Sequence, residues 1–132
     1  MPIRTPITLE SAEELLRPEY NISGLTSGIV LIIGGLGSGT RRLARGIAKR
    51  TGYIHAGELR DWIDWERVID EMADSVPVVA TLHAFDIPSA IKRIEEIPDH
   101  DGEIRRMIRS IVACPTPDQP PVISVLPNPW LP

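Results

Sequence analysis

Cysteine is nearly absent from this sequence, since Cys114 is the only one among 132 residues. A single cysteine excludes an internal disulfide and the cysteine-rich zinc frameworks. The N-terminus lacks the charged-then-apolar pattern of a signal peptide, and no apolar run approaches the roughly 18 residues that span a bilayer. We therefore expect a cytoplasmic protein without membrane insertion.

A surplus of basic charge is also absent. The net charge of -4 and the pI near 5.3 give none of the basic surplus by which nucleic-acid-binding proteins are recognised, so we expect no nucleic-acid partner. Lys49 and Lys92 are the only lysines, and arginine supplies the other basic side chains. The charge is unevenly spread, because residues 41–50 hold five basic groups and residues 58–74 are mostly acidic. The length fits one domain.

The most informative stretch runs from residue 29 to residue 42. The apolar run from Ile29 to Ile33 is typical of a strand buried on both faces of a parallel sheet. Glycines at 34, 35, 37 and 39 then let the backbone turn its amides inward, and a basic helical pattern begins directly after them. Strand, glycine loop and helix start, in this order, form the phosphate cradle of P-loop proteins.

This loop departs from the P-loop motif at the two positions that carry its chemistry. Gly34 and Gly39 have the separation that G-x-x-x-x-G-K-[ST] requires, but Thr40 replaces the lysine and Arg41 replaces the hydroxyl residue. The motif is thus a degenerate Walker A. We predict phosphate binding without efficient phosphoryl transfer, and the alternative is a turn that binds no ligand. The predicted nucleotide-binding residues are Gly34, Gly37, Ser38, Gly39, Thr40 and Arg41.

The rest of the chain alternates between strand and helix patterns. These patterns predict strands at 53–55, 76–82 and, as an edge strand, 122–126, and helices at 40–50, 65–73 with Asp64 as cap, 87–97 with Asp86 as cap, and 103–113. The alternation predicts an α/β, P-loop-like three-layer domain of reduced size with a mostly parallel central sheet. Composition divides the chain into an N-terminal extension with a short helix (1–21), the domain (22–113) and a Pro-rich tail (114–132).

Residues 22 to about 112 resemble the ATPase domain of the secretion ATPases, the family of type IV pilus retraction and assembly motors and type II secretion motors. Gly57-Glu58-Leu59-Arg60-Asp61 looks like the atypical Walker B signature of that family, and Thr81-Leu82-His83 looks like its His box. The resemblance implies catalytic roles for Glu58, which orients water or the magnesium shell, and for His83, which senses the γ-phosphate or couples it to the neighbouring subunit. It implies ATP and Mg²⁺ as cofactors, with no separate metal site, and a subunit-interface or phosphate-sensing role for Arg60 and Arg93.

The chain also departs from this family. Only residues 40–57 separate the glycine loop from Glu58, where the family has a longer stretch with an acidic Asp box and arginines. Together with Thr40 and Arg41, this loss predicts a miniaturised pseudo-ATPase that does not hydrolyse ATP. We expect such a protein to act by binding its own copies or the subunits of a motor ATPase. A compact copy of this kind suits a viral or mobile-element origin.

Three alternatives remain open. The first is a weak nucleotide-binding ATPase that uses Glu58 and His83. The second is an enzyme like the nucleoside monophosphate kinases, because the glycine loop followed by Gly52-Tyr53-Ile54-His55 is similar to their opening. The third is a purely structural role, with residues 115–132 as an extended docking segment.

Overall fold

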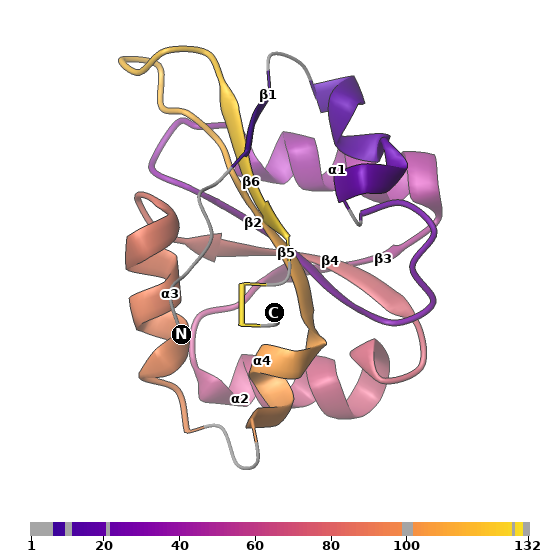
Figure 1. Ribbon diagram of the computed structural model, residues 1–132. Coiled ribbons are helices and arrows are strands. Elements are labelled where there is room, and N and C mark those ends of the chain that lie inside the picture. The colour runs from indigo at the N-terminus through magenta and orange to yellow at the C-terminus, as the bar shows by residue number, and fades with distance from the viewer. Residues whose placement is uncertain (1–6, 10–11, 21, 99–101, 128, 131–132) are drawn as a thin grey trace.

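One six-stranded sheet forms the centre of the protein (Figure 1). The computed structural model describes residues 7–9, 12–20, 22–98, 102–127 and 129–130. The strand order is β1-β6-β5-β2-β4-β3. β5 (Ile108–Ala113), β2 (Gly28–Gly34), β4 (Pro77–His83) and β3 (Ile54–Glu58) run parallel, whereas β6 (Ile123–Pro127) is antiparallel both to β5 and to β1 (Ile7–Leu9). The predicted α/β class with a mostly parallel sheet is confirmed.

β2 separates two hydrophobic cores. All of its residues are buried, as expected for a strand between two parallel neighbours. Ile29, Leu31 and Ile33 pack with α2 (Trp62–Val68), α3 (Ile87–Glu95) and α4 (Glu103–Met107) on one face. Val30 and Ile32 pack with α1 (Thr40–Thr51) and the short 3-10 helices η1 (Ala12–Leu16) and η2 (Pro18–Tyr20) on the other (Figure 1). The domain is therefore built in three layers.

The helix ends follow local chemistry. α1 stops at Gly52, which has a left-handed φ of 82°, and α3 starts at Asp86, whose carboxylate accepts from the backbone N–H of Ser89 at 2.8 Å. The cap of α2 differs from the prediction. Asp61, not Asp64, is the N-cap, and it accepts from the backbone N–H of Asp64 at 3.1 Å. The helix therefore begins earlier and continues into a π-helical turn, η3 (Ile69–Ala73).

The helix predicted over 103–113 is wrong in its second half. α4 ends at Met107, and the chain continues as the parallel strand β5 beside β2. Ile104, Ile108 and Ile111 have helical spacing, but a short apolar run fits a helix and a buried strand equally well. β2 has a second edge that needs a parallel partner, and β5 takes that position. The β-branched residues of β5 favour a strand that is buried on both faces.

The predicted strand near residues 122–126 exists as β6, but it does not lie at the edge. β1 pairs outside it, with Ile7 opposite Val125, and takes the edge position. Both ends of the chain thus extend the sheet beyond its parallel part, while the division at residues 21 and 113 stays a prediction. Residues 1–6, 10–11 and 21 of the predicted N-terminal extension lie outside the described residues. No helix in the described ranges is long and apolar enough to cross a membrane.

Candidate functional site

Three neighbouring strands end at one pocket. The pocket has a volume of about 160 Å³ and lies at the carboxyl ends of β2, β4 and β3, the edge where open α/β sheets gather ligands. It is lined by Gly34, Gly35, Leu36, Gly37, Ser38, Gly39, Thr40, Glu58, Thr81, Leu82 and His83. The structure therefore brings the predicted glycine-loop residues together with Glu58 and His83, which are far apart in the sequence. The chemical roles of these residues stay predictions.

The glycine loop is tightly folded over the end of β2. Gly37 and Gly39 have φ angles of 78° and 81°, a left-handed region that strains other residues. A Cβ atom on Gly34 would come within 2.3 Å of the Ser38 Oγ atom and 2.9 Å of the Thr40 Cγ2 atom. The loop therefore closes directly onto Gly34. α1 begins at its far end without an acidic residue in its first turn, which leaves the positive end of the helix dipole on the loop.

A bulge in β3 sets the direction of Glu58. His55 pairs with Val79, but Gly57 pairs with Ala80, so Ala56 is an extra residue in the ladder. Glu58 consequently lies in register with Thr81. Because side chains alternate along a strand, Glu58 points to the face of the sheet that α1 covers. Gly57 has a φ of 84°, which a glycine adopts without strain.

The hydroxyl of Ser38 is a polar group without a partner. Its Oγ atom is buried and has no hydrogen bond to any of the described residues. Leaving a buried hydroxyl unsatisfied costs about 1–3 kcal/mol, so such a group is expected to find a partner, either an ordered water or a ligand. The Oγ atom lies above Gly34 within the wall of the pocket, where it is placed to donate to a ligand.

The arginines lie on the outer side of the loop. Arg41, Arg42 and Arg45 line a neighbouring cleft of about 560 Å³ together with residues 37–39, and Arg41 does not line the pocket of Glu58. His55 on β3 lies near the cations of this cleft. Burial, and after it the charges of Arg45 and Arg41, hold the pKa of His55 below the usual range. Arg45 and His55 were not predicted as site residues, although Arg41 and Arg45 are spaced by four residues on one helix.

The other two predicted site residues lie outside the pocket. Arg60 Nε is 3.5 Å from Glu58 Oε2, but the two side chains are 78% and 45% exposed, and exposed ion pairs contribute little. Arg93 donates from Nη1 to the backbone oxygen of His83, from α3 on the opposite face of the sheet. Arg93 thus fixes the end of β4 and does not reach the pocket.

The Pro-rich segment packs beside the glycine loop. A Cβ atom on Gly35 would be 3.1 Å from Thr116 Cγ2, and one on Gly37 would be 3.8 Å from Pro117. The segment is held in a turn, because the backbone N–H of Thr116 donates to Gln119 Oε1 at 2.9 Å. Composition alone gave no sign that this segment would return to the loop.

The fold and the loop define a small α/β domain of P-loop-like architecture. Its fold is similar to that of the Legionella pneumophila ATPase DotB, whose X-ray structure matches with a TM-score of 0.58 at 17% sequence identity. The match covers 83% of this chain and 48% of that chain, so the protein corresponds to less than half of DotB. No protein-family model and no curated protein sequence matches the chain. At this identity the match shows a shared fold alone.

Proposed function

We propose that this protein binds the phosphates of a nucleotide on its glycine loop without hydrolysing the nucleotide, and that it acts by contacting other protein chains. The observation that carries the proposal is the shared pocket of the glycine loop, Glu58 and His83, without a lysine or arginine among its lining residues. The loop has the amides and the helix end that hold phosphate. The cation that neutralises the transferred phosphate is not among the residues that line the pocket, and phosphoryl transfer relies on that charge.

The arginines beside the loop support binding more than catalysis. Arg41 and Arg42 are exposed on the outer side of residues 37–39, where they add positive charge near a bound phosphate. Arginine binds phosphate through a wide planar fork, which differs from the point charge of the motif lysine. Arg41 and Arg42 therefore add charge beside a phosphate that the loop amides hold, and they do not replace the motif lysine.

The residues of the pocket fit a magnesium nucleotide. Mg²⁺ that binds with a nucleotide uses one or two carboxylates together with phosphate and water, and Glu58 is the carboxylate that lines this pocket. The unsatisfied hydroxyl of Ser38 adds a further polar group next to it. Within the described ranges, no three His, Cys, Asp or Glu side chains gather into a metal site of their own.

A weak ATPase is the second candidate. The β3 bulge that turns Glu58 toward the loop favours it, because a carboxylate facing a phosphate site is placed to orient water. In either case we propose that the protein partner is another copy of this chain or a subunit of a pilus or secretion motor ATPase.

The double variant Thr40→Lys/Arg41→Thr tests the proposal, because it restores the P-loop motif. We expect the restored variant to bind Mg-ATP at least tenfold more tightly than the wild type in calorimetric titrations. The control is Gly34→Ala, which drives a methyl group into Ser38 and Thr40 and should lose binding in both backgrounds. Equal affinities of wild type and restored variant would contradict the proposed phosphate site.

A further inference from the structure

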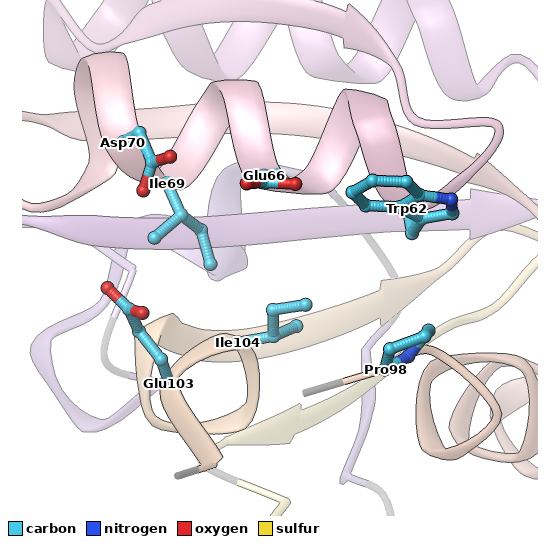
Figure 2. A pocket seen from close by; sticks show the side chains of 7 residues that line it. All are labelled: Trp62, Glu66, Ile69, Asp70, Pro98, Glu103 and Ile104. Carbon is cyan, nitrogen blue, oxygen red and sulfur yellow. The ribbon is translucent and has the colours of Figure 1, made fainter. Parts of the chain in front are cut away.

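A groove lies between two helical segments on the face of the sheet opposite α1 (Figure 2). Its volume is about 350 Å³. Trp62, Glu66, Ile69 and Asp70 line the wall formed by α2 and η3, and Glu103 and Ile104 of α4 line the facing wall. The floor is apolar, because Ile69 and Ile104 are buried, whereas Trp62 at one end is 51% exposed.

The rim of this groove is acidic. Glu66, Asp70 and Glu103 are exposed, and no ion pair with another described residue engages them. On the wall of α2 and η3, residues 61–74 contain six carboxylates and one arginine, whereas α4 also carries Arg105 and Arg106, which do not line the groove. An apolar floor between carboxylates, beside an exposed indole, suits a segment that carries cations on an apolar stem.

α1 is the complementary surface on the same molecule. The helix contains no acidic residue, and Arg41, Arg45 and Lys49 follow each other at intervals of four along one exposed stripe. No ion pair with another described residue engages this basic stripe. Neighbouring cations on the stripe are about 6 Å apart along the helix axis, as are the carboxylates of Glu66 and Asp70.

We propose that the groove binds the basic stripe of a second copy of this chain. The stripe would lie along the groove as a helix, with Arg45 and Lys49 facing the carboxylates and an alkyl stem against Trp62. Opposite charges at matched spacing favour this register and disfavour like-charged alternatives. This inference rests on the part of the proposed function in which the protein contacts other chains, because it names the partner. It does not depend on nucleotide binding.

The two surfaces lie on opposite faces of the sheet, and this fixes the symmetry of assembly. A rigid pair of copies cannot place both helices in both grooves at once, so each copy uses its groove on one neighbour and its stripe on another. Such head-to-tail contacts give rings where the rotation closes and open chains where it does not.

Sedimentation of wild-type protein and of two charge-reversed variants tests this inference. The stripe variant is Arg45→Glu/Lys49→Glu, and the groove variant is Glu66→Arg/Asp70→Arg. We expect wild type to form species larger than dimers in low salt and to dissociate at about 0.5 M salt, where charges are screened within a few ångströms. Each variant alone should associate at least tenfold more weakly.

Mixing the two variants gives the sharpest outcome. The basic stripe of the groove variant faces the acidic groove of the stripe variant, and the two reversed surfaces are also opposite in charge. The mixture should therefore recover association beyond dimers, which neither variant shows alone. The matched control is Glu71→Arg, which changes charge on an exposed residue of η3 outside the groove and should associate like wild type.

Two results would overturn the inference: wild type that stays monomeric at every concentration, or association that survives both charge reversals. Thermal unfolding monitors the fold of each variant, and Glu66→Gln, with an intermediate loss of association, serves where a reversal unfolds the chain. Mg-ATP titration of the groove variant and of Lys49→Glu, which change no residue lining the pocket or the cleft at the glycine loop, separates this contact from the nucleotide site.

Discussion

Glu58 of β3 lies in register with Thr81 of β4, one residue later than an uninterrupted ladder would place it. Without the bulge, Glu58 would pair with Leu82 and point into the core on the face of α2 and α3. With it, the carboxylate shares a face with α1 and joins the glycine loop in one pocket. The bulge therefore decides whether this carboxylate belongs to the site.

Gly57→Ala tests the backbone on which this register depends. A Cβ atom at Gly57 would meet nothing within 4 Å, so the effect comes from forcing alanine into a φ of 84°. We expect the free energy of unfolding to fall by about 1–2 kcal/mol in urea titrations. An unchanged midpoint would show that this residue does not hold the left-handed conformation.

Gly46→Ala is expected to have the opposite effect. Gly46 lies inside α1, has no left-handed φ, and has open space where the Cβ atom would be. Alanine restricts the unfolded chain and favours the helix, so the free energy of unfolding should rise by about 0.5–1 kcal/mol. Destabilisation in the same urea titration would contradict the packing described for α1.

The environment of His55 predicts that the free energy of unfolding decreases as the pH falls. Burial and the charges of Arg45 and Arg41 lower its pKa from the ordinary 6.5, so the unfolded chain binds a proton more readily than the folded chain. The stabilisation is present above pH 6.5 and is lost as the pH falls through the folded pKa. We expect His55→Gln to flatten the decline of unfolding free energy between about pH 7 and pH 5.

Asp86 does not contribute to the pH dependence of stability in this range. Its pKa is lowered from 3.8 by its hydrogen bonds with Ser89, so its contribution is lost only in more acidic solution. A pH profile that His55→Gln leaves unchanged would mean that His55 is not held beside the two arginines.

Cys114 is expected to react slowly in the native protein. The thiol is 6% exposed, and burial raises its pKa to about 11. Only about one thiol in a thousand is then ionised at pH 8, and the thiolate is the reactive form. A disulfide reagent should label the native protein at least a hundredfold more slowly than the urea-unfolded protein. Equal rates would contradict the burial of Cys114.

The sequence could predict the centre of the fold but not its margins. The apolar run that becomes β2 and the glycines after it are local signals, and they specify a buried strand followed by a tight glycine loop. β5 was predicted as helix because Ile108 and Ile111 fit both periods, and only their position next to β2 decides between them.

The site was predictable to a similar degree. Glu58 and His83 stand out through short motifs at strand ends, and the parallel sheet gathers strand ends at one edge. The outward position of Arg41 and the return of Thr116 to the loop depend on tertiary packing, for which the sequence holds no local pattern.

Calorimetric titration of the wild-type protein with Mg-ATP, with released phosphate measured in the same sample, tests the central claim most directly. We predict saturable binding that Arg41→Ala weakens and Gly34→Ala abolishes, with phosphate release no faster than in buffer. Binding with multiple turnovers would contradict a non-hydrolysing role and establish the weak ATPase. Absence of any binding would contradict the phosphate site itself.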